Sequence, residues 1–193
     1  MSVQFSNVPT REIVRFAAAY PFGWIVPVAD PSSALLMPLL IETDAGGEPR
    51  SILGHLPRRA PATDALGRDG AAMFLFLGAN AYIPPGWVSK DDWAPTWNFL
   101  SLKVHASDTR IDEAITRSAV EALVDHMERP AGSDWTVEKI GSRYDALLNS
   151  IIGFRSPVQA LEPRFKLGQD ETPAVYNEIK RALTDHDLAG WME

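Results

Sequence analysis

The chain has 193 residues, of which 46% are hydrophobic, and this is enough apolar material for one domain with its own core. It contains no cysteine, which excludes disulfides, thiolate nucleophiles and zinc sites built on sulfur ligands. The formal net charge of -7 repels phosphate backbones and argues against direct binding to nucleic acid.

The N-terminal segment and the longer apolar runs bear on localisation. Residues 1–10 lack the basic start and the apolar stretch of a secretory signal. The apolar runs at 24–29 and 34–41 are much shorter than the roughly 20 residues that span a bilayer. We therefore expect a cytoplasmic protein with no membrane partner.

The first half of the chain reads as one helix followed by strands. The helix is capped at Pro9 and Thr10 and ends before Pro21. The pattern then predicts five strands, joined in one case by a hairpin turn at 44–47. The predicted strands cover residues 22–28, 34–43, 50–56, 71–77 and 99–105. Several short strands in succession indicate an antiparallel sheet or barrel.

Residues 80–98, between the last two of these strands, are rich in Trp, Pro and Tyr and show no helical or strand period. We predict a long structured loop here, and long loops in compact domains are often functional.

The second half is mostly helical. Helices are predicted over 116–127 and 136–152, a strand over 153–167, and a further helix after the Thr172-Pro173 pair, which is a typical N-cap with proline at the first helical position. The prediction is a single α+β domain over residues 1–193. Residues 1–110 supply most of the barrel with an N-terminal helix, and residues 111–193 supply helices and a further strand.

Common catalytic and metal-binding motifs do not occur. The four histidines have no metal-ligand spacing, and the P-loop, G-x-S-x-G and G-x-G-x-x-G patterns are absent. Asp91 and Asp92 could act as an acid and base pair, but solvated surface explains them better. We therefore predict no metal site and name no catalytic residue.

A basic turn at the end of the third strand carries His55, Arg58 and Arg59. Guanidinium groups bind phosphate oxygens in a bidentate manner, so this turn is a candidate phosphate site in an otherwise acidic protein. The alternative is an ordinary exposed basic turn.

The long loop carries a second cluster, formed by four large aromatic residues. They could make a rigid wall for a flat heteroaromatic ligand or for a partner subunit. The alternative is a Trp-rich mini-core covering one end of the sheet. The four are Tyr82, Trp87, Trp93 and Trp97.

Two segments carry a family resemblance. Residues 77–87, L-G-A-N-A-Y-I-P-P-G-W, and residues 94–99, A-P-T-W-N-F, resemble the G-x-x-A-Y-[IV]-[SP]-P-x-W and P-T-W-N-[YF] blocks of the PaiB-like family, known as FMN-binding negative transcriptional regulators. Further blocks match in order at 21–23, 53–55, 152–154 and 164–171, so the resemblance covers nearly the whole chain.

The resemblance implies a split β-barrel, an antiparallel Greek key with flanking helices, that pairs into a homodimer and holds FMN near the subunit interface. On that basis His55, Arg58 and Arg59 are candidates for phosphate contacts, and loss of Arg58 should weaken FMN binding without affecting folding. The candidates for the flavin ring or the site wall are Tyr82, Trp97, Asn98 and Lys166.

Three positions depart from the family pattern. Met37 stands where relatives commonly have histidine, Ala60 where many have asparagine before a proline, and Thr63 where many have tryptophan. A ring donor and a polar contact are therefore missing from the expected FMN site.

Three functions follow from these observations. The leading one is a flavoprotein with a regulatory or redox-sensing role, in which the flavin carries the redox change. The second is a flavin-dependent NAD(P)H oxidoreductase, and the third is a split-barrel interaction module that has lost FMN. The family is described as transcriptional regulators, but this sequence contains no basic helix of the kind that recognises DNA.

Overall fold

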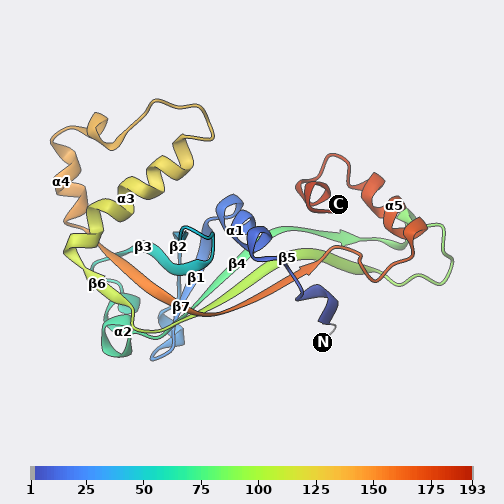
Figure 1. Cartoon of the computed structure of the whole chain (residues 1–193), viewed down its shortest axis with the longest axis horizontal. Helices are drawn as coiled ribbons and strands as arrows, with labels where there is room; N and C mark the ends of the chain where they lie inside the picture. The colour runs from blue at the N-terminus through green and yellow to red at the C-terminus, as the bar shows by residue number, and fades with distance from the viewer. Residues whose placement is uncertain (1–2, 193) are drawn as a thin grey trace.

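Six antiparallel strands close into a barrel in the computed structural model of the chain, which describes residues 3–192 (Figure 1). The strands follow the order β3-β2-β1-β4-β5-β7, and a further pairing of β3 with β7 closes the circle. This is the antiparallel barrel with flanking helices that the sequence predicts. The barrel strands are β1 Phe22–Pro27, β2 Leu35–Thr43, β3 Pro49–Pro57, β4 Ala72–Ile83, β5 Thr96–Ala106 and β7 Ile151–Lys166.

The longest strand, β7, belongs to two parts of the sheet. Its first half pairs with β3 on one side and with the short strand β6 (Arg110–Asp112) on the other, and its second half pairs with β5. Pro157, which has no N–H to donate, lies where β7 leaves β3 and joins β5. One strand therefore carries the closure of the barrel.

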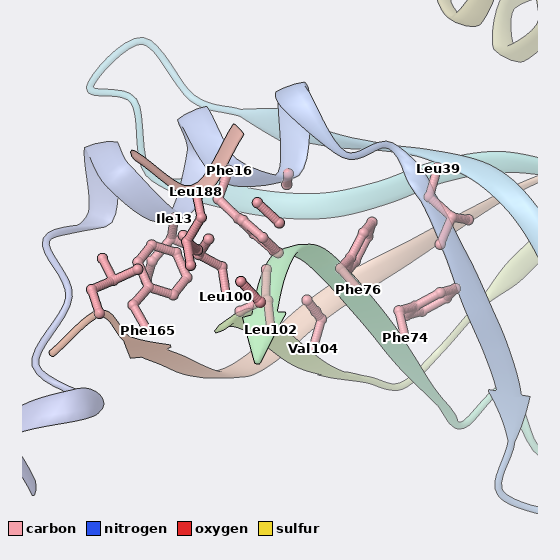
Figure 2. Close-up of a cluster of buried hydrophobic side chains, with 14 of the residues drawn as sticks. Ile13, Phe16, Leu39, Phe74, Phe76, Leu100, Leu102, Val104, Phe165 and Leu188 are labelled. Atoms are coloured by element: carbon pink, nitrogen blue, oxygen red, sulfur yellow. The ribbon is translucent and has the colours of Figure 1, made fainter. Parts of the chain in front are cut away.

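The barrel interior is filled with side chains. Alternate residues of β1, β4 and β5 point inward, as a half-buried strand requires. Phe74 and Phe154 stack across the interior with ring centroids 5.9 Å apart. Figure 2 shows the inward side chains in a continuous row that ends under the first helix. The labelled members are Ile13, Phe16, Leu39, Phe74, Phe76, Leu100, Leu102, Val104, Phe165 and Leu188.

Five α-helices and five short 3-10 turns flank the barrel in residues 3–192. The helices are α1 Thr10–Ala19, α2 Pro61–Asp69, α3 Glu113–Glu128, α4 Arg143–Leu148 and α5 Pro173–Ala182. The 3-10 turns are η1 Val3–Phe5, η2 Pro31–Ser33, η3 Pro85–Trp87, η4 Val137–Ile140 and η5 Asp187–Trp191. None of these helices is long and apolar enough to cross a membrane.

The helix caps agree with the sequence at one end of the chain and not at the other. Thr172 caps α5 as predicted, because its Oγ1 accepts a hydrogen bond from the Val175 N–H. At α1 the N-cap residue is Pro9, one of the two residues of the predicted Pro9-Thr10 cap, but no side chain makes a capping hydrogen bond there.

The loop predicted over 80–98 is shorter in the structure. After a β-bulge between Leu77 and Asn80, β4 and β5 stay paired as far as Ile83 and Thr96. Only residues 84–95 connect the two strands. The long loop was wrong because pairing between the strands overrides the Trp and Pro composition that suggested a loop.

Two other predictions of secondary structure also differ. The helix expected over 136–152 is divided into η4 and α4 by Gly141, whose φ of 67° is left-handed, and β7 begins where the expected helix ends. Helix α2 was missed although Pro61 stands at its first turn and Gly70, at φ 70°, ends it.

Helix α3 packs closely on β7 and leads into an arm, formed with η4 and α4, that projects from the barrel (Figure 1). A Cβ added at Gly153 would lie 2.5 Å from the backbone nitrogen of Thr116. The Gly153 N–H in turn donates to Thr116 Oγ1 at 2.9 Å. Glycine is therefore required where the helix crosses the strand.

We predict that Gly153→Ala lowers the free energy of unfolding by about 1–3 kcal/mol, because the added methyl group must displace helix backbone. Urea unfolding of the purified variant measures this change. Gly67→Ala is the matched control: Gly67 lies in α2 with no atom near its would-be Cβ, so this variant should be neutral or slightly stabilised. Equal stabilities of the two variants would refute the close packing.

Candidate functional site

Large apolar side chains are exposed on the outer wall of the barrel, across β1, β2 and β4. Phe22 is 59% exposed, Trp24 45%, Leu36 39% and Leu77 62%. Trp24 pairs with Leu36 on one side and with Leu75 on the other, so the side chains form one surface. We call Phe22, Trp24, Leu36 and Leu77 the outer face. Exposed apolar surfaces that run over several strands usually mark a binding site.

His55 lies at the edge of the outer face. Gly54, the residue before it, pairs with Leu39, so His55 lies opposite Pro38 of β2. Pro38 in turn pairs with Phe22 of the outer face. On the other side His55 pairs with Gly153 of β7. The histidine thus stands between the apolar wall and the place where α3 crosses the barrel.

The imidazole of His55 is half-buried and incompletely satisfied. Its Nδ1 atom is buried and has no hydrogen-bond partner among residues 3–192. Burial lowers the pKa of His55 below the ordinary 6.5, because the charged form loses its hydration. A neutral imidazole accepts a hydrogen bond at one ring nitrogen and donates one at the other, and its tautomer decides which nitrogen does which.

Arg58, predicted to contact phosphate, is engaged within the chain. Its guanidinium forms a bidentate pair with Glu113 at the start of α3. It also donates to the carbonyl oxygens of Asn149 (3.0 Å) and Ile151 (2.6 Å). The pair with Arg58 lowers the pKa of Glu113. Arg58 therefore ties the end of β3 to α3 and to the start of β7.

The neighbouring Arg59 is exposed and forms no ion pair with any residue of the described chain. It stands between the end of β3 and the first turn of α2. Of the two arginines in the predicted phosphate turn, Arg59 is the one whose guanidinium is available to an anion.

The aromatic cluster of the sequence divides into exposed and buried members. Tyr82 and Trp97 are exposed, pair across β4 and β5, and have ring centroids 5.9 Å apart. Trp93 is buried and its Nε1–H donates to Glu171 at 2.9 Å, so it belongs to the fold. Trp87 lies in η3 and is partly exposed.

Asn98 and Lys166 lie near the exposed pair but in different settings. Asn98 is buried on the opposite face of the strand from Trp97, and its Nδ2 has no partner among residues 3–192. A Cβ at Gly168 would stand 3.6 Å from that nitrogen. Lys166 pairs with Phe99 and its ammonium donates to Thr96.

The structure does not bring all the predicted site residues together. His55 pairs with Gly153 at the start of β7, whereas Lys166 ends the same strand. At about 3.3 Å per residue, roughly 40 Å of strand separates these two positions. In one protomer the group around His55 and the group around Trp97 cannot contact the same small ligand.

The three departures from the family pattern have structural roles here. Met37 packs against the core, Ala60 is the N-cap residue of α2, and the Thr63 hydroxyl donates to the Pro57 carbonyl at 2.9 Å. None of the three belongs to the outer face, which is formed by other residues.

The remaining histidines have partners within the fold. His105 bonds to Glu162 at 2.9 Å, His126 to the Ala18 carbonyl at 2.8 Å, and His186 accepts from the Leu188 N–H. Residues 3–192 contain no group of three or more His, Asp or Glu side chains that could hold a metal ion.

Sequence reasoning missed the outer face, because Phe22 and Trp24 were assigned to a strand without asking which side each faces. The signal was present: Phe22 and Trp24 alternate with Gly23 and Ile25, so two large aromatics share a face that the barrel does not bury.

Comparisons with known proteins agree with this architecture. A family model described as "Putative FMN-binding domain" matches residues 1–160. The chain is 19% identical over 184 residues to "Protease synthase and sporulation protein PAI 2" of Bacillus subtilis (strain 168), which covers 95% of this chain and 88% of that protein.

Two solved structures are similar in fold. The flavocytochrome Anf3 from Azotobacter vinelandii has a TM-score of 0.63 at 10% identity, with 84% of this chain and 69% of that chain covered. The FAD and heme binding protein from Mycobacterium smegmatis has a TM-score of 0.57 at 12% identity, with 81% and 70% covered. At these identities the similarity establishes the barrel fold.

We predict that Arg58→Ala lowers the urea midpoint of unfolding, because Glu113 and two carbonyl groups lose their donor. This revises the sequence-based expectation that losing Arg58 leaves folding intact. Arg59→Ala is the control and should leave the midpoint unchanged, since exposed arginines contribute little. A midpoint in Arg58→Ala equal to that of the wild type would contradict the structural role.

The lowered pKa of His55 predicts a pH dependence of stability. Below pH 6.5 the unfolded chain binds a proton at this histidine while the folded chain does not, so the free energy of unfolding falls as the pH drops from 6.5 toward the folded pKa. Urea unfolding across this range should give a shallower pH dependence for His55→Gln than for the wild type. Parallel curves would rule out His55 as the source.

Proposed function

The chain belongs to the FMN-binding domain family, as its sequence motifs predict, and from this we propose that it binds FMN at the interface of a homodimer and serves as a redox-sensing regulatory protein. The observation that carries the proposal is the outer face, an exposed apolar surface bordered by a histidine with an unused ring nitrogen.

The outer face has the character of a surface that another molecule covers. Four large apolar side chains on three adjacent strands lie open to water, and burying such surface contributes about 25 cal/mol per Å². A charged strip formed by Lys103 and Glu162 lies beside it on β5 and β7. An apolar centre with a polar rim is the usual anatomy of a protein interface.

The residues at this face fit the chemistry of FMN. The flavin ring is flat and largely apolar with hydrogen-bonding groups along its edge, and it suits a wall that contains Trp24 and Phe22. The half-buried imidazole of His55 supplies a hydrogen-bonding group beside that wall. Arg59 supplies a cation for the phosphate that is not committed to another residue described here.

Two protomers can unite the groups that one protomer keeps apart. Tyr82 and Trp97 lie on the part of the β4–β5 ribbon that extends beyond the bulge. This end of the ribbon projects away from β3, the strand that carries His55 (Figure 1). In a twofold dimer, a projecting element of one copy can reach the wall of the other. We therefore assign the wall at His55 and Arg59 to one subunit and the cover at Tyr82 and Trp97 to its partner.

A bound flavin supplies one- or two-electron redox chemistry, and the protein residues position it. Most groups with displaced pKa values are already engaged in the fold. The carboxylates of Glu42, Glu113 and Glu162 each pair with an arginine or lysine, and the pairing lowers their pKa values. We therefore assign the side chains around the flavin to binding and orienting it, with no catalytic group among them. A sensor needs no more than this, because the flavin itself carries the redox change.

The prediction is that wild-type protein binds FMN, seen as a shift in visible flavin absorbance and a change in flavin fluorescence, and that it is a dimer by light scattering. Trp24→Asp places a charge in the outer face and should give a monomer whose affinity for FMN is at least about tenfold weaker.

Leu147→Asp changes an equally exposed leucine on α4, away from the outer face, and should keep both properties. Failure of the wild type to bind FMN, or a Trp24→Asp variant that is still dimeric and flavin-loaded, would overturn the proposal. Rapid multiple-turnover oxidation of NADH or NADPH by the loaded protein would assign the oxidoreductase role instead.

A further inference from the structure

A groove lies between α3 and the segment that follows it. Both belong to the arm that projects from the barrel (Figure 1). The volume of the groove is about 210 Å³, and it is lined from α3 by Glu121, Val124 and Asp125. Trp135, Thr136, Val137 and Glu138 line the opposite side. Trp135 remains exposed although it is among the largest apolar side chains of the arm. The groove is separate from the outer face and from His55.

The charge of the groove is negative. Three of its seven lining residues carry carboxylates and none is basic. Glu121 is 3.9 Å from Arg117, and Asp125 pairs with Arg129 on the exposed side of α3. Glu138 forms no ion pair with any residue in 3–192 and bonds to the Thr136 side chain. Over residues 113–149 seven carboxylates face four arginines and lysines, so the arm as a whole is acidic.

A buried polar atom beside the groove has no partner. Tyr144 of α4 is 7% exposed, and its hydroxyl makes no hydrogen bond within residues 3–192. Burial raises the pKa of Tyr144, and the negative charges of Glu121 and Glu138 raise it further. Two carboxylates of the groove are therefore close enough to act on the phenol. Buried hydroxyl groups without a partner are rare, so this one is an unused hydrogen-bonding group.

We propose that this groove docks a basic segment of a partner protein, with one lysine or arginine side chain lying along Trp135 and its cationic head among Glu121, Asp125 and Glu138. A cation over the face of an indole is attracted by the ring, and surrounding carboxylates complement its charge.

The shape of the groove favours a peptide segment over a free small molecule. Its lining combines the apolar side chains of Val124, Trp135 and Val137 with carboxylates from both sides, and this suits a chain that presents apolar and basic residues in alternation. The acidic arm of a second copy is a poorer complement, because over residues 113–149 its seven carboxylates outnumber its four arginines and lysines.

The experiment uses full-length protein and a fluorescein-labelled peptide of alternating lysine and leucine, followed by fluorescence anisotropy. The same peptide with every lysine replaced by glutamine is the reference. The wild type should bind the lysine peptide at least about tenfold more tightly than the glutamine peptide. Glu121→Gln with Glu138→Gln should lose about tenfold in affinity, and Trp135→Ala about fivefold.

Glu48→Gln with Asp91→Asn removes the same two charges from exposed positions elsewhere and should leave binding unchanged. If Trp135→Ala does not fold by circular dichroism, Trp135→Phe replaces it and should lose less affinity, because an aromatic face remains. Equal weakening by the control pair, or equal affinity for both peptides, would overturn the proposal. Displacement of the peptide by butylammonium at equal concentration would assign a small cation, and groove variants that change the oligomeric state would assign a second copy.

Discussion

The pairing of one strand, β7, with both β3 and β5 is the constraint on which the rest of the structure depends. It closes the barrel, and it places Gly153 where α3 must cross. The same closure brings the end of β3 beside the start of β7, where Arg58 joins the two to α3 through Glu113. The position of His55 follows from this, since it pairs with Gly153 at the closing seam.

A filled barrel decides where a ligand can bind. The stacked rings of Phe74 and Phe154 and the aliphatic side chains around them occupy the interior. A flavin must therefore bind outside the barrel interior. On the outer wall the strand period exposes Phe22 and Trp24 as a direct consequence of burying Gly23 and Ile25. A surface of this kind is incomplete in one subunit, which is why the proposed flavin site is assigned to the contact between two.

Much of the fold could be predicted from the sequence, because strand alternation and helix caps are local signals. The strands at 22–28, 34–43 and 50–56 and the helix after Thr172 lie where their patterns place them. Local signals could not show that β4 continues past Gly78 to Ile83 and that β5 begins at Thr96, since both depend on pairing between the strands. The site was harder to predict than the fold. Arg58 is the kind of residue that binds phosphate, but in the folded chain its guanidinium is already paired with Glu113, which lies 55 residues away in the sequence. The predicted site residues also lie near opposite ends of β7, His55 near its start and Lys166 at its end. This separation depends on how the strands pair, so the sequence could not show it.

The measurement that tests the account most directly is native mass spectrometry of the protein mixed with FMN, because it reads oligomeric state and flavin stoichiometry in the same ion. An interface site predicts dimers that carry two FMN molecules and monomers that carry none. Monomers that carry one FMN each would place a complete site within a single barrel and contradict the account.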